Sequence, residues 1–119
     1  MGQFFVDGEV VKIAFEDGEW IDVKEELSQA DQDYLLDQMA KAESIGKDAK
    51  ISFSLGRLAM LERSIITWSF QIDGKPVPVT KDNISRLRLK YRQKVLEEVN
   101  RLNEQAGEFT RKNSLTAST

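Results

Sequence analysis

The sequence predicts an α+β fold: a small N-terminal antiparallel sheet packed with about three helices, of which the C-terminal helix is the longest. Three observations support this prediction. Apolar and polar residues alternate around an Asp-Gly pair near the N-terminus, a helical repeat of apolar residues begins near residue 29, and a longer helical repeat begins near residue 81. The chain of 119 residues can build one modest core. We therefore expect one domain over 1–107 and a flexible C-terminal tail over 108–119.

The first two strands are predicted to form a hairpin. Ile13 and Phe15 share one face of the first strand, and Trp20 opens the second. Asp17-Gly18 fits a two-residue type I′ turn, which needs positive φ at both central positions. This turn would place Phe15 directly opposite Trp20 as a cross-strand aromatic pair.

Two helices are expected next. Ser28 can cap the first, over about 29–45, and Gly46 can end it. The following segment is ambiguous, because its start alternates like a strand while residues 54–66 fit a helix. Gly56 weakens both interpretations, and we prefer the helix because the pattern outlasts a typical strand.

An extended arm is expected after the second helix. Trp68, Phe70 and Ile72 alternate with other residues, and Asp73-Gly74 then turns the chain. Two prolines hold the following residues extended, because each proline disfavours helix in itself and in its predecessor.

The longest helix is expected after this arm. Thr80 is its predicted N-cap, and apolar residues then recur at intervals of three or four over about 81–106 without a break. Gly107 is expected to end this helix.

The composition argues against an enzyme. Without cysteine or histidine the chain lacks thiolate nucleophiles, disulfides, and the imidazole used in most metal and triad chemistry. The carboxylates near the hairpin are spaced like a solvated face: Glu16, Asp17, Glu19, Asp22, Glu25 and Glu26. Those of the first helix are expected in its first turn and on its exposed face: Asp31, Asp33 and Asp37. We therefore expect no catalytic residues, no cofactor and no tightly bound metal.

Charge is distributed unevenly along the chain. Residues 1–50 carry 13 acidic and 5 basic side chains, a net charge of −8, whereas residues 81–119 carry 5 acidic and 9 basic side chains, a net charge of +4. The basic residues at the start of the last helix do not form one stripe: Arg86, Lys90 and Lys94 share a side, and Arg88 and Arg92 lie on the other flank. Because the whole chain is net acidic, we expect these residues to form a solvated face or a protein contact and not to bind nucleic acid.

Leu89 and Leu96 are the most informative apolar residues outside the main stripe of the last helix. They lie seven residues apart and about 120° away from the face that carries Ile84, Tyr91 and Val95. Either the core covers a wide arc of this helix, or these leucines form a second apolar surface for a partner protein. Leu89, Leu96 and Trp68 are the candidate partner-binding residues, and Trp68 could equally be an anchor of the core.

The chain is expected to be soluble and intracellular. It has no run approaching the roughly 18–20 apolar residues that span a bilayer, and no basic segment followed by an apolar run at its N-terminus. We therefore expect no association with membranes.

Several of these segments together resemble the tail assembly chaperones of long-tailed phages, and the similarity covers about residues 9–105. It rests on the acidic hairpin 17–23, the helical segment 27–39, and a tryptophan-centred arm that leads into a long helix. The most specific element is that arm, with the residues Ile66-Thr67-Trp68-Ser69-Phe70 followed by Asp73-Gly74-Lys75-Pro76-Val77-Pro78-Val79-Thr80.

The resemblance implies a small non-catalytic protein that binds the long tape measure protein, keeps it soluble and helps the tail tube polymerise around it. The implied partners are the tape measure protein and the tail tube protein, and self-association is compatible with this function. The resemblance also implies action in the host cytoplasm and absence from the mature virion. Two other functions stay open: a structural tail or connector component of the phage particle, and a small nucleic-acid-binding regulator.

Overall fold

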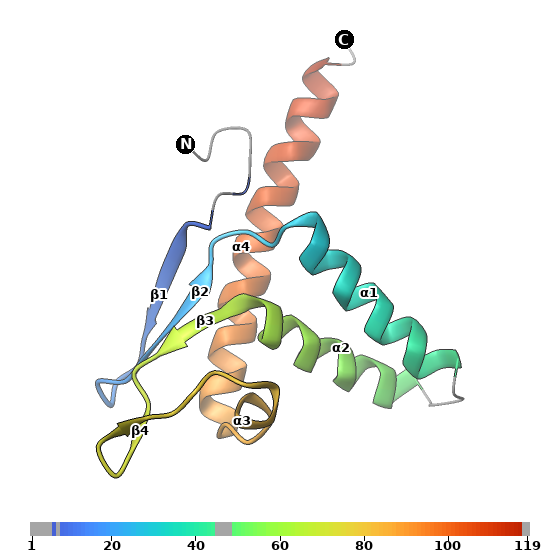
Figure 1. The fold of residues 1–119 in the computed structure, drawn as a ribbon. Coiled ribbons are helices and arrows are strands. Elements are labelled where there is room, and N and C mark those ends of the chain that lie inside the picture. Colours follow the sequence, from blue (N-terminus) through green and yellow to red (C-terminus); the bar gives the residue numbers. More distant parts are fainter. Residues whose placement is uncertain (1–5, 7, 45–48, 118–119) are drawn as a thin grey trace.

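The computed structural model describes residues 6, 8–44 and 49–117, with side chains at positions 6, 8–42 and 54–104. It has a three-stranded antiparallel sheet near the N-terminus, a separate two-stranded hairpin and four helices, the last of them the longest (Figure 1). The predicted α+β class is confirmed.

The main sheet consists of β1 (Val10–Ala14), β2 (Trp20–Lys24) and β3 (Ile65–Trp68), with β2 in the centre. Ile21 lies opposite Ile13 on one side and Trp68 on the other, so all three side chains face the core. A bulge shifts the register of β2 and β3 and leaves Ile66 without a partner residue on β2. Ile66 is consequently one of the exposed large apolar residues.

The hairpin between β1 and β2 corrects the predicted pairing by one residue. Ala14, and not Phe15, lies opposite Trp20. The Phe15 amide donates to the Glu19 carbonyl oxygen over 2.9 Å, which leaves a three-residue loop. Gly18 alone takes positive φ, at 87°, so the loop is a turn followed by a glycine bulge and not the type I′ turn we expected.

Helix α1 (Gln29–Ser44) begins where the sequence predicts. The Asp31 amide donates to Ser28 Oγ over 3.2 Å, and the Ser28 amide donates to Asp31 Oδ2 over 3.0 Å. Ser28 and Asp31 thus satisfy each other's backbone donors, which confirms the cap. Gly46, the expected stop, lies outside the described residues.

Helix α2 (Ala49–Ser64) starts and ends earlier than expected. Ile65 and Ile66 belong to β3 and not to the helix, because the edge of β2 offers hydrogen-bonding partners and Ile65 pairs with Val23. Gly56, which weakened the helical interpretation, lies where α1 packs against α2: a Cβ at this position would stand 3.2 Å from Cγ and Sδ of Met39.

The arm after β3 folds into a small hairpin of β4 (Gln71–Ile72) and β5 (Lys75–Pro76). Asp73 and Gly74 both take positive φ, 53° and 76°, so the predicted turn is confirmed and its angles match a two-residue type I′ turn.

The predicted continuous helix over 81–106 is wrong in two respects. It is divided into α3 (Lys81–Ser85) and α4 (Leu89–Ala117), and α4 continues past Gly107. Thr80 caps α3 as expected, since Thr80 Oγ1 accepts from the Asn83 amide over 3.1 Å. An internal glycine costs a helix only about 1 kcal/mol, which does not suffice to end it.

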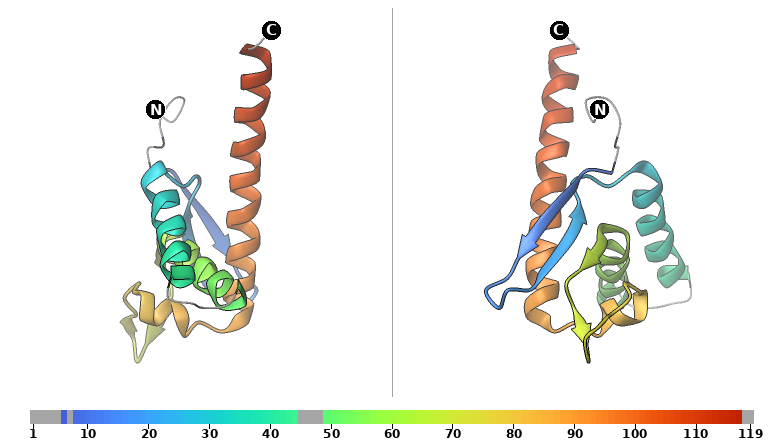
Figure 2. Two further views of the ribbon diagram at one scale, coloured as in Figure 1. Left: turned by 90° about the vertical axis from the view of Figure 1, so that its right-hand side faces the viewer. Right: turned by 60° about the vertical axis from the view of Figure 1, so that its left-hand side comes forward.

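Because the helix breaks after Ser85, α3 and α4 can take different directions while both pack against the same core. Ile84 of α3 and Val95 of α4 are both almost fully buried. Helix α4 lies behind the sheet in Figure 1, and its C-terminal turns extend beyond the sheet in both views of Figure 2. The buried cluster joins the sheet to α2, α3 and α4 and contains Ile13, Ile21, Val23, Leu61, Ile65, Trp68, Ile84, Val95 and Val99.

Candidate partner-binding site

Leu89 and Leu96 line the same groove between α2 and the first turns of α4. This groove, which we call the leucine groove, has a volume of about 380 Å³. Its residues are Ser54, Leu55, Arg57, Leu58, Leu61, Ser85, Leu89, Arg92, Gln93 and Leu96. The two leucines singled out from the sequence therefore lie on one concave surface.

The two leucines are not equally available to a partner. Leu89 is 56% exposed, which makes it one of the exposed large apolar residues of the described chain. Leu96 is half-buried and packs against the core cluster. The core therefore covers much of Leu96, whereas Leu89 is largely exposed to solvent.

The chain positions Leu89 by the break between α3 and α4. Leu89 is the first residue of α4, and the Arg86 and Leu87 amides donate to the Asn83 and Ile84 carbonyl oxygens just before it. Opposite Leu89, helix α2 contributes three leucines to the groove. The apolar surface is therefore built by two elements that are distant in the sequence.

Two arginines, Arg57 and Arg92, lie at this groove. Arg57 Nη2 donates to Ser54 Oγ over 3.4 Å, and Arg92 Nε donates to the Leu87 carbonyl oxygen over 3.0 Å. Among the described residues that line the groove, none carries a carboxylate. The described lining of the leucine groove thus combines apolar side chains with two arginines.

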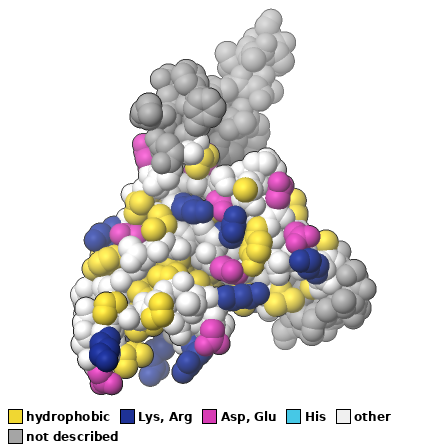
Figure 3. Space-filling view, viewed as in Figure 1, with side chains coloured by type: hydrophobic (Ala, Val, Ile, Leu, Met, Phe, Trp, Pro, Cys, Tyr) yellow, Lys and Arg dark blue, Asp and Glu magenta, His cyan; other side chains and the backbone are white. Residues whose placement is uncertain are grey.

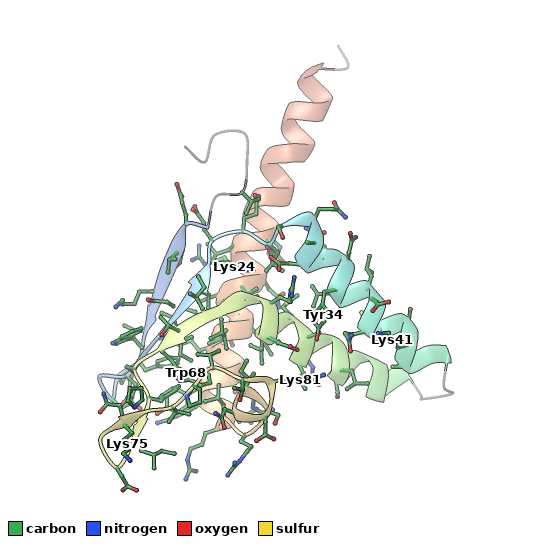
Figure 4. All side chains as sticks on the ribbon, in the orientation of Figure 1. Lys24, Tyr34, Lys41, Trp68, Lys75 and Lys81 are labelled. Atoms are coloured by element: carbon green, nitrogen blue, oxygen red, sulfur yellow. The ribbon has the colours of Figure 1, made fainter. Side chains whose placement is uncertain are left out.

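Trp68 lies elsewhere, in the core. Its side chain, labelled in Figure 4, is only 7% exposed and packs among the buried residues under β3. Trp68 Nε1 donates to the Val77 carbonyl oxygen over 2.6 Å. Of the two roles considered for it, the structure shows the core anchor, and it does not bring Trp68 together with Leu89 and Leu96.

The basic residues at the start of α4 contact the acidic hairpin of the same chain. Lys90 Nζ lies 3.3 Å from Asp17 Oδ2, and the Tyr91 hydroxyl donates to the same oxygen. Lys94 Nζ donates to the Ala14 carbonyl oxygen over 2.9 Å. The hydrogen bond from Tyr91, followed by those from the Glu19 amide and Lys90, lowers the pKa of Asp17 below its ordinary value. The charge asymmetry of the sequence is therefore partly neutralised within the fold.

Charges of both signs also mix on the face of the molecule seen in Figure 3. Lys and Arg side chains on this face are separated by acidic and apolar ones, without a continuous basic tract. At the start of α4, Lys90 lies beside a carboxylate and Lys94 donates to a carbonyl oxygen.

Asp31 is the residue that the sequence analysis misplaced. It lies in the first turn of α1, as expected, but its side chain is only 2% exposed and does not belong to the exposed face. Lys24 Nζ lies 3.0 Å and Arg63 Nε lies 2.9 Å from its carboxylate oxygens. Burial opposes ionisation, but hydrogen bonds from Lys24 and Ser28 outweigh it and lower the pKa of Asp31. The Ser-x-x-Asp spacing indicates the helix cap. The ion pair between Asp31 and Arg63 could not be predicted from the sequence, because the two residues lie far apart along the chain.

The part of the chain that the structure describes contains neither a cluster of metal ligands nor a helix that could span a membrane. Within it, no three His, Cys, Asp or Glu residues gather closely enough to hold a metal ion. Among the same residues, none of the helices combines the length and apolar character needed to cross a membrane.

Comparison of the chain with protein-family models, with characterised proteins and with solved structures gave no match.

Proposed function

We propose that this protein is a non-catalytic tail assembly chaperone of a long-tailed phage, which binds the tape measure protein and assists assembly of the tail tube. The observation that carries the proposal is the convergence of Leu89 and Leu96 in the leucine groove. The hairpin, the tryptophan-centred arm and the long helix resemble that family. This resemblance is the reason for proposing the tape measure protein as the partner. No catalytic group enters the proposal, because a chaperone of this kind acts by binding alone.

The exposure of Leu89 fits a protein that covers an apolar client. A single exposed leucine is common on protein surfaces, but one that lies in a concave apolar groove is typical of binding sites. The half-buried Leu96 and the leucines of α2 give the groove a packed floor. A client side chain entering it would exchange water for apolar contacts on several sides.

The two alternatives are less well supported. A structural tail or connector component would use the same groove but would stay in the particle. A nucleic-acid-binding regulator would need free basic side chains, whereas Lys90 and Lys94 contact the hairpin and Arg86 lies 3.9 Å from Asp82.

The direct test is co-purification of this protein with the tape measure protein of the same phage. Leu89→Glu should abolish the association, because it places a charge on the apolar surface of the groove. Leu36→Glu is the matched control, since Leu36 is 65% exposed on α1 and does not line the groove. Retention of binding by Leu89→Glu, or equal loss in both variants, would contradict the proposal.

Analysis of purified virions separates the chaperone from the structural component. A chaperone should act in the host cytoplasm and be absent from mature particles, whereas a connector should be present in them. Co-purification with the tail tube protein, and the mass of the isolated protein in solution, test the two further partners: the tube subunit and a second copy of this chain.

A further inference from the structure

We propose that a second pocket, on another face of the start of α4, binds an aromatic side chain of a partner protein that has a carboxylate side chain next to it in its sequence. This pocket, which we call the aromatic pocket, has a volume of about 390 Å³. The described residues that line it are Asp17, Glu19, Phe70, Arg86, Leu87, Arg88, Lys90 and Tyr91. No described residue lines both this pocket and the leucine groove, so the inference goes beyond the proposed function and does not depend on it.

Three segments that are distant in the sequence form the aromatic pocket. They are the loop between β1 and β2, the residue Phe70 just before β4, and the junction of α3 with α4. All three lie at the lower end of the molecule in Figure 1. The volume of the pocket is within the range of ligand pockets, which begins at about 300 Å³.

The wall of the aromatic pocket suits a ring. Phe70 and Tyr91 contact each other edge to face, with ring centroids 4.9 Å apart. Both rings and Leu87 are half-buried, because they pack against the core cluster and also line the pocket. An aromatic side chain that enters the pocket would add a third ring to this pair and would contact Leu87.

The two carboxylates of the pocket are already hydrogen-bonded within the chain. Asp17 accepts from the Tyr91 hydroxyl and from Lys90 Nζ, the latter over 3.3 Å. Glu19 Oε2 accepts from Ser69 Oγ over 2.5 Å. Both carboxylates therefore hold the walls of the pocket together.

Arg88 supplies the charge that a ligand would meet. Its side chain is exposed and has no hydrogen bond, ion pair or ring contact among the residues that the structure describes. Arg86, which also lines the pocket, lies 3.9 Å from Asp82, and both of these side chains are more than three-quarters exposed. A carboxylate beside the bound ring would meet the guanidinium of Arg88, which can donate two parallel hydrogen bonds to it, whereas a lysine would be repelled.

A carboxylate suits this pocket better than the phosphates of a nucleic acid. Among the described lining residues, three are cations and two are carboxylates, and Lys90 already lies beside Asp17. A nucleic-acid strand would bring several negative charges past Asp17 and Glu19, whereas a single carboxylate can approach Arg88 alone.

Three capped peptides with the same Gly-Ser flanks test the proposal. One contains Asp-Trp-Asp, one Asn-Trp-Asn and one Asp-Ala-Asp, and each is titrated into the full-length protein while amide shifts are followed by NMR. Asp-Trp-Asp should bind roughly threefold tighter than Asn-Trp-Asn at low salt, which is the effect of an exposed ion pair, and this preference should shrink as salt is added. Asp-Ala-Asp should bind at least about tenfold more weakly than Asp-Trp-Asp, because it lacks the ring.

The amide shifts also locate the binding. Those of Leu87 and Tyr91 should change on titration, whereas that of Leu58, which lines the leucine groove, should not. Shifts confined to Leu58 would contradict the proposal.

One pair of variants identifies the charge. Arg88→Gln should remove the preference for Asp-Trp-Asp over Asn-Trp-Asn. Arg101→Gln is the control, since it changes the net charge equally, but Arg101 pairs with Glu98 and does not line the pocket, so the preference should persist. Circular dichroism and thermal midpoints confirm that both variants are folded.

The inference is overturned if neither tryptophan peptide binds, if the two bind equally well, or if Arg88→Gln keeps the preference. Tighter binding of a short oligothymidine than of Asp-Trp-Asp at the same amides would also overturn it, because the ligand would then be a nucleic acid. So would a monomeric Arg88→Gln variant of a dimeric parent in sedimentation experiments, because a second copy would then occupy the pocket. None of these outcomes changes the test of the leucine groove, which is binding of the tape measure protein.

Discussion

Arg63 Nε, at the end of α2, donates a hydrogen bond over 2.9 Å to Asp31 Oδ1, at the start of α1. Lys24 Nζ on β2 donates to both oxygens of the same carboxylate. One buried carboxylate thus joins two helices and the central strand. The helix pair α1 and α2, which extends to the right of the sheet in Figure 1, is held to it at this point.

Asp31→Asn should lower the free energy of unfolding by about 2–3 kcal/mol, somewhat less than a fully buried ion pair, because Lys24 and Arg63 are each about a third exposed. Denaturant titration measures this change. Asp37→Asn is the control, since Asp37 forms an exposed pair with Lys41 on the same helix and should change the free energy by under about 0.5 kcal/mol. Equal effects of the two substitutions would show that the Asp31 cluster has no special role.

The same carboxylate predicts how stability depends on pH. Because the folded-state pKa of Asp31 is lowered, the ionised form stabilises the fold above the unfolded-state pKa of about 4. This contribution is lost as the pH falls through the folded-state pKa. Unfolding free energies of the wild type and of Asp31→Asn should therefore converge as the pH is lowered below about 4. A gap that does not change with pH would contradict this assignment.

Trp68→Ala should cost roughly 3–5 kcal/mol of stability, because it removes a large buried ring from the core. Trp68→Phe keeps much of the apolar contact but leaves the Val77 carbonyl oxygen without its donor, so it should cost about 1–3 kcal/mol. Denaturant midpoints rank the two variants. Unchanged midpoints in Trp68→Ala would show that the arm contributes little to the fold.

Gly56 tests the packing of α1 on α2. Gly56→Ala should change the unfolding free energy by no more than about 1 kcal/mol, because the gain in helix propensity offsets the close approach to the flexible Met39 side chain. Gly56→Leu should destabilise by about 1–3 kcal/mol, because Met39 occupies the space it needs. Thermal unfolding of the two variants provides the comparison, and equal stability would show that the helices separate at little cost.

The two tyrosines provide a spectroscopic test of the hairpin contact. The hydrogen bond to Asp17 raises the pKa of Tyr91 above 10.0, and the hydrogen bond to Glu62 does the same for Tyr34. Both phenols should therefore ionise above pH 10.0 in an absorbance titration. Asp17→Asn should return one of them towards 10.0, and Glu62→Gln should return the other. If Asp17→Asn leaves the titration curve unchanged, Tyr91 does not donate to Asp17 in solution.

Local signals in the sequence predicted several elements correctly. Ser28 and Thr80 cap the helices that follow them, and Asp73-Gly74 forms a turn. Each of these features depends on the conformational preference or the hydrogen bonds of residues that are close in the chain. Such preferences are nearly independent of the rest of the fold, so the residue types alone reveal them.

Two of the incorrect predictions involve contacts between distant segments, and a third involves the length of one local loop. The spacing of Ile65 and Ile66 fits a helix, but these residues lie in a strand because the edge of β2 offers backbone hydrogen-bonding partners. The apolar repeat over 81–106 did not indicate the break after Ser85, because the residues on both sides of it keep helical spacing. The break depends on how α3 and α4 each pack against the core. In the hairpin, a one-residue difference in loop length places Ala14 and not Phe15 opposite Trp20.

The sequence by itself determined the class of the fold, the caps at Ser28 and Thr80, and the turn at Asp73-Gly74. It also determined that Leu89 and Leu96 lie away from the main apolar stripe of their helix. Only the tertiary structure decided that these leucines face α2 across a groove, that Asp31 is buried against Lys24 and Arg63, and that the basic start of α4 meets the acidic hairpin. The physical reason is one of distance along the chain. Periodicity and capping arise between near neighbours, whereas burial, grooves and ion pairs between elements exist only once the whole chain has packed.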